Sequence, residues 1–191
     1  MKSDPKIVLI CVILSILPVS ADVLVFNEIP LNYPWTGYMG EQNGIEALDV
    51  DTTWPGEPEN GTHCAYISYD RTKEQWSSLF IQGDGTWNRG PGIGLNLAGC
   101  DKLVFYAKGR VGQENVKFGF GYDTADQSGL TDSSYASRVI TLTNYWTRYE
   151  LDLSGKDLSH INGLFMFSVD AFNNPYNVEF YLDNITYVDA T

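Results

Sequence analysis

Apolar and polar residues alternate along most of the chain after residue 22, which is the pattern of β-strands that bury one face. The clearest example is Lys102–Ala107, where Leu103 and Phe105 point one way and Val104 the other. The same period predicts strands over 23–28, 45–50, 62–69, 76–81, 116–122, 138–142, 146–153, 164–169 and 178–187. The pattern contains no amphipathic helix and no internal repeat. Short strands separated by turn signals therefore predict an all-β fold, a two-sheet antiparallel β-sandwich of the jelly-roll type.

The inward faces of these strands predict the core between the two sheets. It is expected to consist of Leu103, Phe105, Phe118, Phe120, Tyr149, Leu151, Phe165, Phe167, Phe180 and Leu182. The strand over 116–122 has a second face with Lys117, Gly119 and Gly121. Two glycines on one face leave a shallow floor, which either admits a ligand or marks a bulge or close packing of another strand.

The first 21 residues have the pattern of a secretory signal peptide. Lys2 and Lys6 precede an apolar run over 7–17, and Val19-Ser20-Ala21 supplies small residues for cleavage. We expect cleavage after Ala21, which leaves one domain over 22–191 in a secreted or extracytoplasmic protein. The alternative is an uncleaved leader that keeps the protein at the cell surface.

The domain contains two cysteines, Cys64 and Cys100. In an exported protein such a pair can form a disulfide, and both residues flank predicted strands. The alternative is that Cys64 is a buried small residue.

Composition narrows the function. The formal net charge of −12 excludes nucleic acid, whose phosphates need Lys and Arg. Aromatic residues make up 14% of the chain, more than a core of this size needs, so some are expected at a sugar- or protein-binding surface. The two histidines, His63 and His160, have no zinc-type spacing, and no carboxylate pair stands out, so we expect a protein that is not an enzyme.

Several segments, taken in order, resemble β-jelly-roll carbohydrate-binding modules of the family-eleven-like, galactose-binding-domain-like group. They cover almost the whole chain after the leader. They are GYMGE (37–41), HCAYISY (63–69), Trp76 with the loop over 82–92, LAGCDKLVFYAKG (97–109), WTRYELDLSGKDLS (146–159), the Asn174-Pro175 turn and FYLDNI (180–185).

The resemblance implies a structural calcium ion held between the first strand, an early loop and the last strand. Carried onto this chain, it points to Glu28, Asp51 and Asp183, whose oxygens suit Ca²⁺. The alternative for Asp183, which lies within a strand, is a carboxylate held by hydrogen bonds.

The resemblance also implies a shallow ligand groove lined by aromatic residues. Arg89 is expected to bond two sugar hydroxyls while Trp87 stacks on the ring. Trp76 and Trp146 are assigned to packing. The candidate ligand residues are Trp35, Tyr38, Trp87, Arg89, Tyr106 and Tyr135.

The resemblance thus implies an exported domain that binds a polysaccharide or glycan without catalysis. The first alternative is a cell-envelope or adhesion domain whose aromatic residues contact a protein. The second is a glycoside-active enzyme, which needs two carboxylates converging in a cleft.

Overall fold

The computed structural model describes residues 21–28, 31–41, 45–83, 94–122 and 132–190. Within these ranges no helix is long and apolar enough to cross a membrane. The strands are β1 (Val23–Phe26), β2 (Met39–Gly40), β3 (Leu48–Trp54), β4 (Cys64–Tyr69), β5 (Trp76–Gln82), β6 (Cys100–Gly109), β7 (Asn115–Phe120), β8 (Ala136–Thr141), β9 (Thr147–Asp152), β10 (Gly163–Asp170) and β11 (Val178–Asp189).

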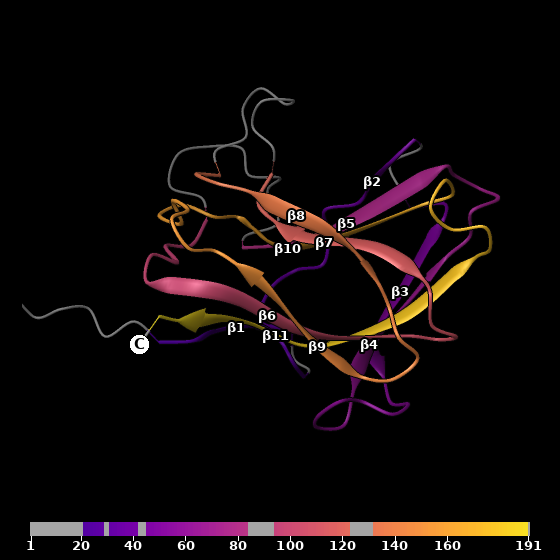
Figure 1. Cartoon of the computed structure of the whole chain (residues 1–191), viewed down its shortest axis with the longest axis horizontal. Helices are drawn as coiled ribbons and strands as arrows, with labels where there is room; N and C mark the ends of the chain where they lie inside the picture. The colour runs from indigo at the N-terminus through magenta and orange to yellow at the C-terminus, as the bar shows by residue number, and fades with distance from the viewer. Residues whose placement is uncertain (1–20, 29–30, 42–44, 84–93, 123–131, 191) are drawn as a thin grey trace, which may run out of the picture.

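The strands form two antiparallel sheets that lie face to face (Figure 1). One sheet has the order β3-β4-β11-β6-β9, with β1 also paired to β11. The other has the order β2-β5-β10-β7-β8. The prediction of an all-β, two-sheet antiparallel sandwich is therefore confirmed.

The core between the sheets is built from aromatic rings. Phe105 from the six-stranded sheet contacts Phe118 and Phe165 of the five-stranded sheet, with ring centroids 4.8 and 5.2 Å apart. Phe180 contacts Phe118 and Phe167 in the same way. Nine of the ten predicted core residues are buried, and Tyr149 is partly buried against them.

Strand β11 departs from strict alternation. Phe180 and Leu182, at even-numbered positions, face the core, and so do Ile185 and Tyr187, at odd-numbered positions. The pairing with β6 shifts between Asp183 and Thr186, and Asn184 has a φ of 54°. A bulge at this place adds one residue and turns the second half of the strand back toward the core.

Two boundaries differ from the sequence prediction. β3 continues through Asp51–Trp54, beyond the strand predicted over 45–50, because Asp51 and Trp54 pair with β4. The segment before β2 extends the five-stranded sheet: the backbones of Gly37 and Phe80 exchange two hydrogen bonds of 3.1 and 3.2 Å. The sequence predicts no strand here, since Pro30, Pro34 and Gly37 favour a loop.

The predicted disulfide is not formed, since Cys64 and Cys100 are both buried thiols. Both lie beside β11 but at different heights. Ala65 pairs with Leu182, which places Cys64 next to Asp183, whereas Cys100 pairs with Asp189. Six residues of strand correspond to about 20 Å, and a disulfide requires Cα atoms within about 7 Å. Burial raises the pKa of the Cys64 thiol to about 12.

The aromatic core predicts a sharp contrast between two phenylalanines. Phe118→Ala removes a fully buried ring and should lower the free energy of unfolding by about 3–5 kcal/mol. The same substitution at Phe172, which is 95% exposed, should change it by less than about 0.5 kcal/mol. Urea unfolding followed by fluorescence measures both. Similar losses in the two variants would contradict the assignment of Phe118 to the centre of the core.

Candidate ligand-binding groove

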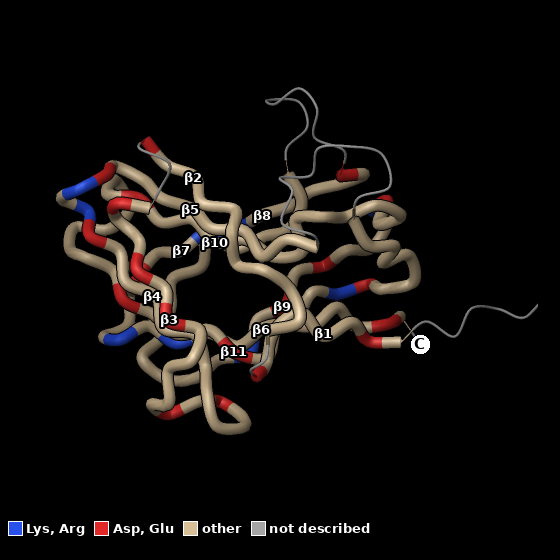
Figure 2. The backbone as a smooth tube through the Cα atoms, turned by 180° about the vertical axis from the view of Figure 1, so that it is seen from behind, with Lys and Arg blue, Asp and Glu red and all other residues tan. Residues whose placement is uncertain are grey.

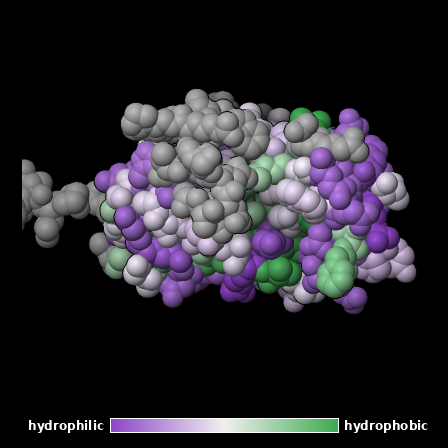
Figure 3. Space-filling view, turned by 90° about the horizontal axis from the view of Figure 1, so that it is seen from above, coloured by the Kyte–Doolittle hydropathy of each residue, from purple (hydrophilic) through white to green (hydrophobic). Residues whose placement is uncertain are grey.

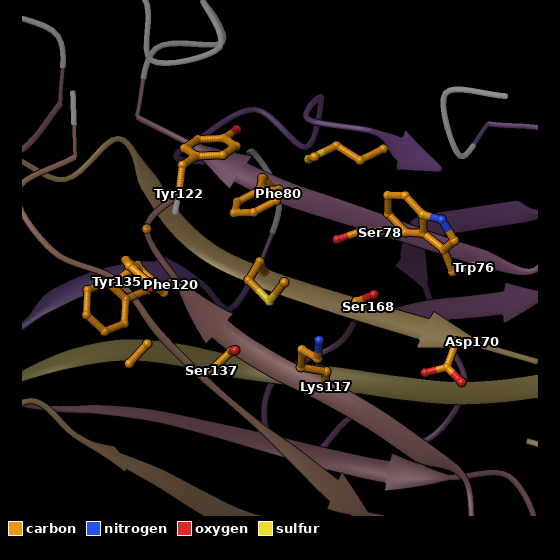
Figure 4. Close-up of a pocket in the computed structure, with 14 residues that line it drawn as sticks. Trp76, Ser78, Phe80, Lys117, Phe120, Tyr122, Tyr135, Ser137, Ser168 and Asp170 are labelled. Atoms are coloured by element: carbon orange, nitrogen blue, oxygen red, sulfur yellow. The ribbon is translucent and has the colours of Figure 1, made fainter. Parts of the chain in front are cut away.

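A groove with a volume of about 460 Å³ lies on the outer face of the five-stranded sheet (Figure 4). Figure 3 looks toward this side of the molecule and shows patches of apolar surface among hydrophilic ones. The groove is lined by Met39, Trp76, Ser78, Phe80, Lys117, Phe120, Gly121, Tyr122, Tyr135, Ala136, Ser137, Met166, Ser168 and Asp170.

The register of the strands places three polar side chains in one row across the floor. Ser168 on β10 pairs with Ser78 on β5 and with Lys117 on β7. The row ends at Met39 on one side and at Val139 on the other. It therefore crosses all five strands, perpendicular to their direction.

Aromatic residues flank this polar row on both sides. On β5, Trp76 lies two residues before Ser78 and is 37% exposed, and Phe80 lies two residues after Ser78. The Phe80 ring stacks on Tyr122 with centroids 4.1 Å apart and planes within 17°. Tyr135, 47% exposed, lies near Tyr122 at the end opposite Trp76 (Figure 4). Phe80 and Tyr122 line the groove but are only 5% and 3% exposed, so its exposed aromatic walls are Trp76 and Tyr135.

The polar groups of the groove differ in their availability. Lys117 is exposed and forms no ion pair with any residue that the structure describes. Asp170 instead accepts hydrogen bonds from the backbone and side-chain amide of Asn173, at 2.7 to 3.0 Å. Asp170 is also the one carboxylate among the described residues that line the groove, so these residues do not supply the pair that a glycosidase needs.

The two glycines of the β7 region are required by packing. A Cβ atom on Gly119 would lie 2.3 Å from the carbonyl oxygen of Ala136 on β8. Gly121 has a φ of 67°, and a Cβ atom there would lie 2.2 Å from the carbonyl oxygen of Ser134. Close packing of the neighbouring chain therefore explains both residues, and Gly121 also lines the groove.

The predicted ligand residues are dispersed in the structure. Tyr135 lines the groove. Trp35, in contrast, is 8% exposed and packs edge-to-face on Phe26 in the core, so it is not at the surface. Tyr38 is half-buried against the same core, and Tyr106 lies on β6 in the other sheet. Trp87 and Arg89 lie outside the described residues.

Sequence reasoning missed Trp76, Phe80 and Tyr122 as groove residues. The available signal was the alternation within β5, where Leu79 and Ile81 face the core and therefore turn Trp76, Ser78 and Phe80 outward. Trp76, which is assigned to packing from the sequence, is 37% exposed and lines the groove.

A second aromatic cluster covers the outer face of the six-stranded sheet. Tyr66 contacts Trp54 and Tyr181, with centroids 4.9 and 5.4 Å apart. The ammonium group of Lys108 lies over the rings of Tyr181 and Trp146. These rings are partly exposed, and they contact one another and a cation. Trp146 also donates a hydrogen bond to a backbone carbonyl, which agrees with a packing role.

The three predicted calcium ligands each have protein donors. Asp183 is fully buried and accepts the backbone N–H groups of Glu59, Asn60 and Asn184 at 2.8 to 3.1 Å. Glu28 accepts the N–H and hydroxyl of Thr62, in the same loop.

The third predicted ligand, Asp51, accepts the N–H and hydroxyl of Thr53 and does not join the other two. Among the described residues no group of three or more His, Cys, Asp or Glu side chains could hold a metal ion. The predicted set therefore does not fit a calcium cage. Glu28 and Asp183 instead hold the loop over 59–62 from two sides.

Asp183 predicts a pH dependence of stability. Burial raises its pKa to about 6, above the value near 4 of an exposed aspartate. Between these values the folded state binds more protons than the unfolded state, so this group makes the free energy of unfolding fall as pH rises from about 4 to 6. Asp183→Asn should remove that contribution, about 3 kcal/mol at most, when both proteins are unfolded in urea with a chelator present. If the difference between the two proteins stays constant over this range, Asp183 does not titrate as its burial indicates.

No family model and no curated protein sequence matches the chain. Solved structures do match it. A family 30 carbohydrate-binding module is 20% identical with a TM-score of 0.59, over 89% of each chain. The family 30 module of a cellulosomal cellulase of Clostridium thermocellum is 20% identical with a TM-score of 0.61, over 88% of this chain and 98% of that one. The family 11 module of another cellulosomal cellulase of that organism is 16% identical with a TM-score of 0.61, over 89% and 95%. The chain therefore has the jelly-roll fold of carbohydrate-binding modules, as the sequence resemblance implied.

Proposed function

We propose that this protein binds a polysaccharide or oligosaccharide, without catalysis, in the groove on the outer face of the five-stranded sheet. The observation that carries the proposal is the floor with Ser168 and the exposed Lys117 between two exposed aromatic side chains of the groove, Trp76 and Tyr135. A pyranose has an apolar C–H face and a rim of hydroxyls. Aromatic walls suit the face, and an ammonium group and hydroxyls suit the rim.

The dimensions of the groove favour a chain over a single sugar. The polar row crosses five strands, and neighbouring strands lie about 4.8 Å apart, so the row is about 19 Å long. A linear oligosaccharide lying across the strands would contact every part of it. We therefore expect affinity to increase with the number of sugar residues until the row is filled.

The similar structures support the same class of ligand. A family 11 module from Clostridium thermocellum, 16% identical with a TM-score of 0.61, was solved in complex with a β-1,3-1,4-mixed-linked tetrasaccharide. We take mixed-linked β-glucan as the first ligand to test. Asp170 is the one carboxylate among the described residues of the groove, and this supports binding over hydrolysis, which needs two.

Export and calcium binding are separate parts of the proposal. The leader pattern over 1–21 supports export. N-terminal sequencing of the secreted protein tests it, and the expected first residue is Asp22. Calcium rests on the sequence resemblance. An increase of the melting temperature on addition of Ca²⁺, reversed by chelator, would support a bound structural ion, and an unchanged melting temperature would contradict it.

A protein partner in the cell envelope is the second candidate. Its support is a group of exposed apolar side chains on the β6–β7, β8–β9 and β10–β11 turns. They are Val111, Tyr145, Phe172 and Tyr176, which are 64 to 95% exposed. This surface is distinct from the groove, so substitutions there separate the two functions.

The proposal predicts that Trp76→Ala weakens glycan binding while Trp146→Ala does not. Removing the Trp76 ring should weaken the binding free energy by about 2 kcal/mol, which raises the dissociation constant roughly 30-fold. Trp146 is the matched control, because it lies on the outer face of the other sheet. Isothermal titration of the domain over 22–191 with mixed-linked β-glucan oligosaccharides, after a glycan-array screen, measures both. Trp87→Ala, in the same assay, tests the prediction that Trp87 in the loop over 82–92 stacks on the sugar ring.

Two results would contradict the proposal. A folded wild-type protein that binds no glycan on the array would exclude carbohydrate binding and favour the protein partner. Glycan binding that is lost in Trp146→Ala and kept in Trp76→Ala would move the site to the six-stranded sheet.

A further inference from the structure

Asp132 is a buried carboxylate beside the groove that does not line it. Asp132 is 6% exposed. One carboxylate oxygen, Oδ2, accepts the backbone N–H of Tyr122 at 2.8 Å and that of Gly163 at 3.2 Å. The other, Oδ1, accepts the backbone N–H of Asn162. One side chain therefore joins the chain just after β7 to the chain at the start of β10.

The backbone of Tyr122 lies beyond the end of its strand, where the Asp132 carboxylate accepts its N–H group. Strand β7 ends at Phe120, and Gly121 turns the chain with a φ of 67°. The N–H of Gly121 donates to the carbonyl of Gly163, and the next N–H, that of Tyr122, donates to Asp132. The space is tight, since a Cβ atom on Gly163 would lie 3.2 Å from Asp132 Oδ2 and from the Phe80 ring.

The far end of the Tyr122 side chain is held by a second polar contact. Its hydroxyl accepts a hydrogen bond from the side-chain amide of Gln82, which is fully buried. The carbonyl oxygen of that amide accepts the hydroxyl of Thr36 at 2.9 Å. Asp132 thus fixes the backbone of Tyr122, Gln82 fixes its hydroxyl, and the ring between them lies flat on Phe80.

We propose that Asp132 is a positioning residue of the groove, which holds in place the Tyr122 ring that lines the groove and thereby sets the affinity for glycan without touching the ligand. The inference rests on the proposed function for its effect on affinity. Only a carboxylate offers two acceptor oxygens and no donor to three converging N–H groups. Burial raises the pKa of Asp132, and the three N–H groups oppose that increase. A buried carboxylate is costly, and positioning of this ring accounts for its use here.

The test compares matched substitutions at two buried carboxylates. Asp132 and Asp183 each accept three backbone N–H groups, but Asp183 lies in the six-stranded sheet. Asp132→Ala should raise the dissociation constant for a mixed-linked β-glucan oligosaccharide about tenfold, and Asp132→Asn by less, at a temperature where every variant is folded. Asp183→Ala should leave it within about twofold. If either alanine variant fails to fold, the comparison is made between Asp132→Asn and Asp183→Asn.

A second readout does not need a ligand. A crystal structure of Asp132→Asn, or of the alanine variant, should show the Tyr122 ring displaced from Phe80, whereas the Asp183 variant should keep the 4.1 Å stack. A ring that stays in place in the Asp132 variants would overturn the proposal, as would equal losses of affinity in the Asp132 and Asp183 variants. If the wild-type protein binds no glycan, the proposed function fails, and the position of the ring alone decides whether Asp132 holds Tyr122.

Discussion

Packing of aromatic rings between the two sheets is the constraint on which the rest of the structure depends. Phe105 of one sheet contacts Phe118 and Phe165 of the other, and this contact decides which face of each strand turns inward. A strand that buries one residue must expose the next. Because Phe118 is buried, Lys117 lies on the outer face of β7. A shift of register by one residue would exchange core and groove floor, so the same packing fixes both.

The groove therefore consists of a rigid part and a part held by local contacts. Its floor lies on paired strands, where Ser78, Ser168 and Lys117 are fixed by the register. The Tyr122 ring, which lines the groove, follows the end of a strand and is held by the side chains of Gln82 and Asp132. Acidic residues outnumber basic ones along the chain (Figure 2). In this acidic setting the exposed ammonium group of Lys117 gives the floor a local donor that suits neutral hydroxyls.

The two outer faces of the sandwich show why composition could not locate the site. Both carry Trp and Tyr residues and a lysine. On the six-stranded sheet the rings of Trp54, Tyr66 and Tyr181 contact one another, and Lys108 lies over two rings and bonds Glu57 at 2.9 Å. On the five-stranded sheet the aromatic residues stand on either side of a polar row. The difference lies in the arrangement of the residues and not in their kind.

The sequence by itself determined the fold class and most strands, because alternation along a strand is a local property. For the same reason nine of the ten core residues that it predicts are buried. It could not place Trp35 in the core or keep Cys64 apart from Cys100, since both depend on which strands become neighbours. The bulge in β11 and the short edge at β2 were likewise decided by pairing. Only the tertiary structure brought Asp132 to the backbone of Gly163 and aligned Ser78, Ser168 and Lys117 in one row. These contacts join residues far apart in the chain, and no local pattern encodes them.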